Sequence, residues 1–513
     1  MNDFNVKEYV IGSPASSRFK KLDNDRNAVL DRARNCAKLT IPSIIPDTGH
    51  SETQALVTPF QALGSRLVNN LASKLMLSLF PPNLSFFRLI PSAQVKRAIK
   101  DAQKDELLNE VEQNYMLIEQ EMMRDVERQA LRVPIFDALK SLIIAGNSLL
   151  YKTEEGLKNY KLTNYVVVRD YFGNIMEVIT KEGLNRNTLD EDLVVQLPSE
   201  QQEETETDEI IDLYTRCILR DGVWYEWQEV GEVFVESSEK TYKSKDELPF
   251  IPLRWTSING ENYGRGHVEQ YIGDFRSLEA LYQILIETSE VSSKVIFGKR
   301  PGTITEVKDL QDASNGDVIE GDLESDISVL RVDKGGDLQI PLNLVQDLTR
   351  RLEQAFLSAN SATRQSERTT ATEIRYMAND LEESLGGLYS ILSLELQRPL
   401  AYQLLKDSNV EVDFNISDIV IVTGVDALGR NVELDKITQF TQIIQTLGSP
   451  DLILPKMKLD GFIKMVGNAI SLDVTTLIKS DEEIQAEQQA QQEQQLAMQG
   501  ASNVVEQETT QQQ

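Results

Sequence analysis

The residue types that most often carry chemistry are scarce in this sequence. Its two histidines, His50 and His267, are isolated, and we expect each to be a surface or packing residue and not a metal ligand or a base. Its two cysteines, Cys36 and Cys217, lie far apart and lack CxxC spacing, so neither a disulfide framework nor a thiolate metal site is expected.

Two further patterns could bind a nucleotide or transfer a proton, and both fall short. Gly264-x-Gly266 lacks the third glycine of a dinucleotide-binding fingerprint and begins no βαβ unit, and no GxxxxGK[ST] phosphate loop occurs. Glu382 and Glu383 are adjacent, so they diverge on a helix and indicate a solvated face, not an acid/base couple. The sequence therefore predicts no catalytic group, no cofactor and no bound metal.

The charge balance bounds the possible partners. The 513 residues predict roughly two to four folding units. They include 81 acidic and 52 basic residues, a formal net charge of −29, which is the wrong sign for a protein that grips nucleic acid by its phosphates. Any DNA partner is expected to be bound weakly.

No signal-peptide pattern occurs, and no stretch approaches the roughly 18 apolar residues of a membrane span. We therefore expect a soluble product of a reducing cytoplasm.

The elements that would position functional residues begin with helices. Residues 18–38 read as one amphipathic helix, and a second helical pattern runs from Leu56 to Leu79 and closes at Pro81-Pro82. A longer third helix is predicted from Val95 to Ala130. The first 150 residues are therefore expected to be mainly helical.

The apolar period then changes from 3.6 to 2, which predicts a β-rich insert. Residues 165–169 and 175–179 are expected to form two strands joined by a Gly-Asn turn. Residues 212–218 and 224–227 read as further strands after an acidic loop at 200–208. The insert is expected to end near residue 250.

Helical periodicity returns with its clearest signal after Gly264. From Val268 to Ile296, apolar and small residues alternate at spacings of three and four over about four heptads, so one face should pack against other helices. Residues 297–340 favour strands and turns, and a helix returns after Pro341. The order predicts an α+β chain that is mainly helical.

A long amphipathic helix is predicted from Thr369 to Lys406. The Gly386-Gly387 pair weakens it by about 1 kcal/mol per residue relative to alanine. Pro399 removes an internal hydrogen bond. A bend is expected at one or both places.

Several of these stretches resemble one protein family. The matching segments, in chain order, are NGENYGRGHVEQYIGDFRSLEALYQ (259–283), SSKVIFG (292–298) and SERTTATEIRYMANDLEESLGGLYSILSLELQRPL (366–400). With weaker matches elsewhere, they cover the chain from about residue 18 to 480. On these segments the chain resembles the portal, or head-to-tail connector, proteins of short-tailed, autographivirus-type bacteriophages.

The resemblance implies a portal fold in which twelve copies form a ring around a DNA channel. The implied regions are a wing (1–264, helical over 1–150, with the β-rich insert at about 160–256), a first stem helix (265–296), a clip (297–340), a second stem helix (341–360), a tunnel loop (361–369), a long bent channel helix returning to the wing (370–424), a crown (425–479) and a Gln/Glu-rich tail (480–513). We expect the tail to be disordered, with a weak helical barrel as the other option.

The resemblance also implies partners and a place. The ring would sit in the virion at one capsid vertex, the head-tail junction, after assembly in the host cytoplasm. Terminase large subunit and then the tail adaptor would dock at the clip, major capsid and scaffolding proteins at the wing, and internal core proteins at the crown. Double-stranded DNA would pass through the channel, and no membrane is involved.

An acidic channel wall suits a sliding duplex, because it prevents strong phosphate binding while a few basic side chains centre the DNA. The candidate basic residues are Arg364 and Arg368 in the tunnel loop and Lys294, Lys299 and Arg300 at the junction of stem and clip. Each could instead form an ion pair within the chain or with a neighbouring subunit.

Two other classes of protein remain open from the sequence. An acidic helical scaffolding protein without a DNA channel would share the charge and the heptads, but would lack the aromatic insert that contains Trp224, Trp227 and Trp255. An acidic intracellular enzyme would need a catalytic constellation that the sequence does not contain.

Overall fold

The computed structural model describes residues 5–51, 53–81, 85–101, 105–153, 155–185, 210–293, 296–303, 306–318, 320, 322–330, 338–358, 381, 383–385, 387–407 and 417–421. These belong to two compact units. Unit 1 comprises Met1–Pro82 and Val126–Asp407, and unit 2 comprises Asn83–Asp125 and Ser408–Gln513.

Helices open unit 1. They are α1 (Val6–Gly12), α2 (Ala15–Asp25), α3 (Asn27–Lys38), α4 (Leu63–Leu79) and α7 (Arg132–Ala145). The single helix predicted over 18–38 is wrong, because Arg26 leaves helical geometry between α2 and α3 and its guanidinium turns back to Asp23. The second helix begins at Leu63 and not at Leu56, since Pro59 disfavours helix before it and the Gln61 side chain accepts from the N–H of Gly64.

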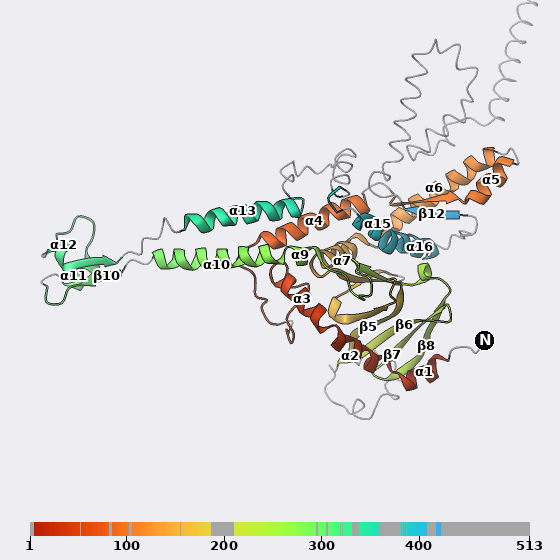
Figure 1. The fold of residues 1–513 in the computed structure, drawn as a ribbon, viewed down its shortest axis with the longest axis horizontal. Coiled ribbons are helices and arrows are strands. Elements are labelled where there is room, and N and C mark those ends of the chain that lie inside the picture. Colours follow the sequence, from red (N-terminus) through yellow and green to blue (C-terminus); the bar gives the residue numbers. More distant parts are fainter. Residues whose placement is uncertain are drawn as a thin grey trace, which may run out of the picture. The chain divides into compact units, whose positions relative to one another are not determined.

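A five-stranded antiparallel sheet forms the centre of the β-rich insert (Figure 1). Its strands, in the order β4-β5-β6-β7-β8, are β4 (Tyr165–Arg169), β5 (Ile175–Asn185), β6 (Ile210–Arg220), β7 (Val223–Val230) and β8 (Val233–Tyr242). The predicted strands at 165–169, 175–179, 212–218 and 224–227 are confirmed. Gly173, at φ +87°, makes the turn between β4 and β5.

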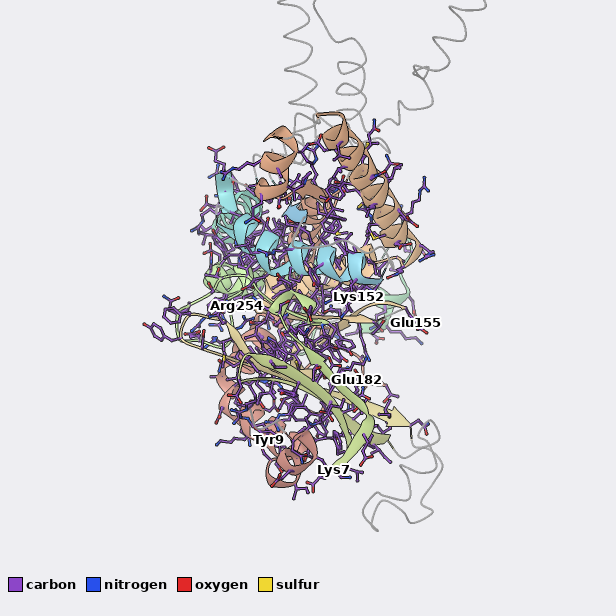
Figure 2. The ribbon with its side chains drawn as sticks, turned by 90° about the vertical axis from the view of Figure 1, so that its right-hand side faces the viewer. Lys7, Tyr9, Lys152, Glu155, Glu182 and Arg254 are labelled. Atoms are coloured by element: carbon purple, nitrogen blue, oxygen red, sulfur yellow. The ribbon has the colours of Figure 1, made fainter. Side chains whose placement is uncertain are left out.

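One face of this sheet is covered by α1 and α2. Phe19 of α2 packs on Tyr214, and Tyr9 of α1 packs edge-on against Trp227 with ring centroids 6.1 Å apart. Figure 2 shows Tyr9 and Lys7 on α1 at this end of the sheet. Arg216 lies buried beneath them and donates to a carboxylate oxygen of Glu177 at 2.5 Å and 2.9 Å.

A second, three-stranded sheet has the order β3-β2-β9, with β2 (Asn147–Thr153), β3 (Gly156–Tyr160) and β9 (Phe250–Arg254). The insert was predicted to end near residue 250, which is where β9 begins. Pro252 is tolerated since β9 is an edge strand, where a missing N–H breaks no ladder bond on the outer side.

The heptad-patterned stretch, residues 268–296, forms the short α9 (His267–Gln270) and the longer α10 (Ile272–Ser293), and its last residue, Ile296, begins a strand. The helix predicted after Pro341 is α13 (Gln339–Ala355), which lies beside α10 (Figure 1). Between them in the chain come α11 (Val307–Asp312), α12 (Leu323–Asp326), and an antiparallel pair of β10 (Ile296–Lys299) and β11 (Ile327–Leu330). Residues 297–340 therefore contain short helices that were not predicted. Pro341 lies in the first turn of α13, not at its first position.

Residues 381 and 383–385 of the predicted long helix are described and helical, and Leu381 is buried. From Leu388 the chain continues as α15 (Leu388–Leu392), one turn of π-helix (Ser393–Gln397) and α16 (Arg398–Asp407). The start of that prediction, residues 369–380, and the predicted crown and tail lie outside the described residues.

Unit 2 pairs segments far apart in sequence. Strand β1 (Phe87–Pro91) lies antiparallel to β12 (Ser417–Ile421), and α5 (Ala93–Asp101) and α6 (Asp105–Arg128) follow β1. The Leu89 N–H donates to the buried Glu119 carboxylate of α6 at 2.9 Å. The described residues of the helix predicted over 95–130 are helical up to Arg128, and residues 102–104 between α5 and α6 lie outside the described residues.

Candidate DNA-channel site

Two of the five basic residues predicted to face DNA lie in the described part of the chain. Lys299 ends β10, and the Arg300 N–H donates to the Asp326 carbonyl at 2.9 Å. Both side chains are exposed, and neither forms an ion pair with another described residue. The other three predicted residues, Lys294, Arg364 and Arg368, lie outside the described residues.

The predicted bend at Pro399 coincides with a change of helix type. Proline has no N–H to donate to the carbonyl four residues earlier, here that of Glu395, and its ring crowds that oxygen. The wider π turn at Ser393–Gln397 accommodates both effects. Gly387 precedes α15 with open space around its Cα, and Gly386 lies outside the described residues. The bend itself stays a prediction.

The π turn is tied to the sheets by buried charges. Glu395 accepts from Arg254 at the end of β9, with 3.0 Å between Nη2 and Oε1. Arg169, at the end of β4, donates to the carbonyls of Gly173 and Pro252 at 2.9 Å each. Burial, and then the neighbouring Arg254, lower the pKa of Arg169 to about 10. Arg254, labelled in Figure 2, therefore connects β9 to the π turn that precedes α16.

The glycines of Gly264-x-Gly266 allow two backbone segments to cross. A Cβ on Gly264 would lie 2.8 Å from the carbonyl oxygen of Gly146, and one on Gly266 would lie 2.5 Å from that of Ile144. The buried Asn147 side chain fixes the crossing, because it accepts from the Gly264 N–H at 2.7 Å and donates to the Gly264 carbonyl at 3.1 Å. The pair serves backbone packing and not phosphate binding.

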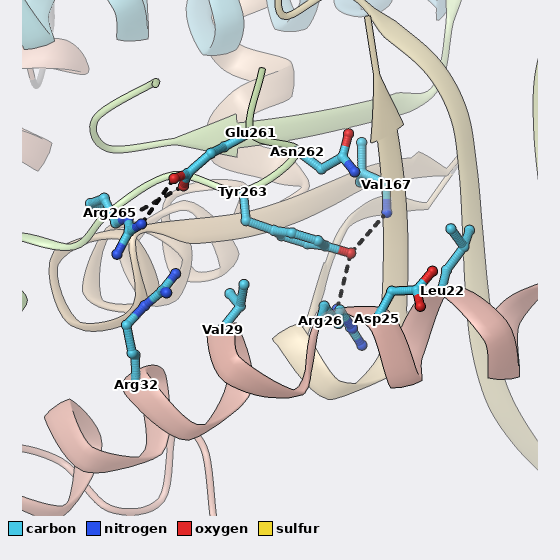
Figure 3. Close-up of a pocket in the computed structure, with 10 residues that line it drawn as sticks. All are labelled: Leu22, Asp25, Arg26, Val29, Arg32, Val167, Glu261, Asn262, Tyr263 and Arg265. Carbon is cyan, nitrogen blue, oxygen red and sulfur yellow. Dashed lines mark hydrogen bonds and ion pairs between the residues drawn. The ribbon is translucent and has the colours of Figure 1, made fainter. Parts of the chain in front are cut away.

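The same segment closes the free edge of β4 (Figure 3). The Asn262 side-chain oxygen accepts from the Arg169 N–H at 2.8 Å, and the Tyr263 hydroxyl accepts from the Val167 N–H at 3.2 Å. Arg26 also donates to that hydroxyl, at 3.4 Å. Two amides of this edge strand, those of Val167 and Arg169, are thereby bound by side chains.

A cavity of about 260 Å³ lies beside this edge and is lined by several arginines. Each arginine already has a carboxylate partner. The pairs are Arg26 with Asp23, Arg32 with Glu269, and Arg265 with both Glu261 and Glu269. Because these charges are matched, the cavity offers no surplus positive charge to an anion.

His267 is a packing residue, as expected. Its Nε2 lies 3.0 Å from the Ala355 carbonyl oxygen, and its ring lies 4.7 Å from that of Phe356 and 5.4 Å from that of Trp255 between centroids. Burial lowers its pKa, which favours the neutral ring. The contact joins the start of α9 to the end of α13.

Among the described residues, no three His, Cys, Asp or Glu side chains gather in a way that could hold a metal ion. None of the helices described has the length and apolar character that a bilayer crossing requires.

Sequence reasoning missed the buried polar residues that fix this region. Asn147 stands directly after the glycine that ends α7, amid apolar residues, and that isolation was a usable signal. Arg254 and Glu395 carry no such signal, since they are 141 residues apart and each is ordinary in its own segment.

Comparisons with known proteins agree with one another. The portal protein of Enterobacteria phage T3 is 38% identical over 488 residues, 92% of this chain and 89% of its own. That of Escherichia phage T7 is 38% identical over 501 residues, 94% and 91% of the two chains, and that of Enterobacteria phage SP6 is 32% identical over 489 residues, 94% and 93%. The family model for the bacteriophage head to tail connecting protein matches residues 13–478. With that match over most of its length, the chain belongs to the family of bacteriophage head to tail connecting proteins.

Proposed function

We propose that this chain is the portal protein of a short-tailed bacteriophage. Twelve copies form a ring at one capsid vertex, and double-stranded DNA passes through the ring during packaging and ejection. The relatives named above are portal proteins, and the family is described by a connecting role and not by a catalytic one.

The structural observation that carries this proposal is the surface of α10 and α13. The two helices bury Phe275 and Leu278 at one end of α10. Further along α10, Ile284, Ile286 and Val291 are 49%, 48% and 47% exposed. On α13, Ile340, Leu342 and Leu344 are also exposed. Apolar side chains that one chain leaves open along two helices indicate a contact with another protein, and identical head-to-tail contacts that close give a ring.

The family resemblance supports an assignment of regions within the ring. We assign α10 and α13 to the stem, the β10–β11 pair with α11 and α12 to the clip, and the two sheets with α1–α3 to the wing. Terminase and later the tail adaptor dock at the clip, capsid and scaffolding proteins at the wing, and core proteins at the crown. Assembly takes place in the host cytoplasm.

DNA is held weakly in the channel. The net charge of −29 opposes tight phosphate binding, while the exposed Lys299 and Arg300, together with Lys294, Arg364 and Arg368, supply local positive charge. The acidic channel wall repels the duplex, and a few basic side chains keep it in the centre. The DNA can then slide while a separate motor protein drives it.

Native mass spectrometry and negative-stain imaging of the purified chain test the ring. Twelve copies of 57.9 kDa give about 0.7 MDa, and images should show a central hole. Ile284→Glu with Val291→Glu should abolish the ring, whereas Ile11→Glu on the wing, also exposed, should not. A monomer or an elongated dimer of the unaltered chain would favour a scaffolding protein instead.

Removing the predicted tunnel-loop charges tests the DNA contact. Arg364→Ala with Arg368→Ala should leave the ring intact and reduce packaging or genome retention. The matched control, Lys20→Ala with Lys21→Ala, removes two exposed charges from α2 and should behave as wild type. Normal packaging and genome retention in the arginine variant would remove this assignment.

A further inference from the structure

The turn between β4 and β5 holds two aromatic side chains out in solvent. Tyr171 is 71% exposed and Phe172 is 85% exposed, and their rings lie edge to face with centroids 6.0 Å apart. A single exposed apolar residue is ordinary, but two adjacent aromatic rings form a patch, and aromatic residues are enriched where proteins contact one another. We call Tyr171 and Phe172 the aromatic tip.

The backbone beneath the aromatic tip is fixed. The Gly173 N–H donates to the Asp170 carbonyl at 3.0 Å, and the Asn174 N–H donates to the Asp170 carboxylate at 2.7 Å. The buried Arg169 guanidinium donates to the Gly173 carbonyl at 2.9 Å, and a Cβ on Gly173 would lie 3.0 Å from Nη2 of Arg254. A rigid turn loses little conformational entropy when its side chains bind, so the tip is preorganised for a contact.

A hollow of complementary chemistry lies on the same unit, between the end of α3, the loop that follows it, and α10. Its volume is about 520 Å³, and its walls include the apolar residues Pro42, Ile45, Pro46, Leu56 and Pro59. Proline and aromatic rings suit each other, since proline-rich peptides bind to aromatic-lined grooves. We call this space the proline hollow.

The charged groups at the proline hollow already have partners. Lys38 pairs with Asp47 at 2.9 Å. The carboxylate oxygens of Glu279, on α10, accept from the backbone N–H groups of Phe60 and Gln61 at 2.8 Å and 3.3 Å. These bonds hold the loop against α10, so the hollow is formed before anything enters it.

We propose that the aromatic tip of one copy of this chain seats in the proline hollow of the next copy. This inference rests on the proposed function, because a ring needs two different and complementary surfaces on each copy. The net charge of −29 makes the copies repel one another. Their contacts are therefore favoured where charge is absent, as on the two aromatic rings, or already bound, as in the hollow.

The place of the hollow favours a second copy over a different protein. Glu279, at the hollow, and Ile286 are seven residues apart, so they lie on the same face of α10, about 10 Å apart along its axis. Ile286 belongs to the exposed apolar surface to which we assign the contact between copies. The hollow continues that surface, so one neighbouring copy covers both.

Disulfide cross-linking of the assembled full-length chain tests the contact. The native Cys36 and Cys217 do not interfere, because both are buried and burial raises the pKa of both thiols. Tyr171→Cys with Val57→Cys, at the exposed rim of the hollow, should give a ladder of covalent multimers, since each copy joins two neighbours. Each single variant should give none. The control pair Ile11→Cys with Val57→Cys should also give none, although Ile11 is similarly exposed.

Dilution of the rings gives a second, independent measurement. Phe172→Ala should raise the protein concentration at which half of the rings dissociate by about tenfold or more, the usual effect of removing an aromatic anchor. The unfolding midpoint of the single chain should stay the same, because this ring is already in solvent. Ile11→Ala, which shortens another exposed apolar side chain, should change neither quantity.

The outcomes separate this contact from the proposed function. Rings that form without a ladder overturn the seating of the tip and leave the ring in place. Dimers alone also overturn it, since they indicate a symmetric contact. In assembled heads, cross-linking of the tip only to capsid or scaffolding protein overturns it as well. A chain that forms no ring refutes the proposed function and this contact with it. If Tyr171→Cys prevents ring formation, an unchanged dissociation concentration for Phe172→Ala overturns the contact.

Discussion

Replacing Gly266 by alanine tests the backbone crossing most directly. Gly266 has φ −79° and ψ 159°, an extended conformation that alanine adopts freely, so the substitution adds no backbone strain. The added Cβ, however, would lie 2.5 Å from the Ile144 carbonyl oxygen, 2.9 Å from its carbon and 3.0 Å from the Gly146 nitrogen. All three are backbone atoms, so no side chain can turn aside to make room.

The cost follows from what must move. Ordinary contacts of a Cβ begin at 3.4 Å, so α7 and the segment before α9 must separate by nearly 1 Å. Overpacking costs about 1–3 kcal/mol, occasionally more. The same displacement stretches the bonds of Asn147 to Gly264, each worth about 1 kcal/mol. We expect a total loss of about 3 kcal/mol or more.

Thermal and urea unfolding midpoints of the purified chain measure this loss. Gly273→Ala is the matched control, because Gly273 lies on α10 with no atom within 4 Å of the added Cβ, and alanine favours helix there by up to about 1 kcal/mol. The midpoint should fall clearly for Gly266→Ala and stay or rise for Gly273→Ala. Equal midpoints for the two variants would refute the crossing as the reason for this glycine.

Three further predictions concern buried charge and the bend. Arg254→Met and Glu395→Gln should each lower the free energy of unfolding by about 3 kcal/mol, because each single change leaves a buried charge unpaired. The double variant should lose less than the sum of these two losses. Losses that add up in unfolding measurements would contradict this. Burial raises the pKa of the Glu226 carboxyl above the ordinary glutamate pKa of about 4.3. The carboxyl therefore contributes fully to stability at pH values below that ordinary pKa, and this contribution is lost as the pH rises through the raised pKa. The stability of wild type relative to Glu226→Gln should therefore fall with rising pH, and a flat difference across pH titrations would disprove it. Gly386→Ala with Gly387→Ala should stiffen the bend and impair ring assembly or packaging, and normal rings that package DNA would return this helix to an ordinary core role.

The sequence predicted strands better than helix boundaries, for a physical reason. The runs 165–169 and 175–179 are rich in β-branched and aromatic residues and flank a Gly-Asn turn, which favours strands, and the structure has strands there. Helix ends depend instead on single residues such as Arg26, whose side chain finds a partner that periodicity does not reveal. Helical periodicity alone therefore predicted one helix where the structure has two, α2 and α3.

The buried polar groups were beyond sequence reasoning. Period 2 places Glu177 between Ile175 and Ile179, on an apolar face, where it pairs with Arg216 beneath α1. The pattern of neither strand identifies the other residue as its partner. The π turn could be foreseen only as a defect at Pro399, because its partner Arg254 comes from a distant strand. Of the five predicted DNA-facing residues, the two that the structure describes, Lys299 and Arg300, are exposed, and their contact with DNA remains a prediction.

The closed edge of β4 has a consequence for how copies of this chain can meet. An edge strand with unsatisfied amides is a template on which another strand can add, and subunits waiting at high concentration would polymerise through it. Asn262 and Tyr263 occupy the Arg169 and Val167 amides, so a strand of another copy that approaches β4 finds these two donors already bound. Ordered assembly of many copies is favoured when such an edge is closed within each copy.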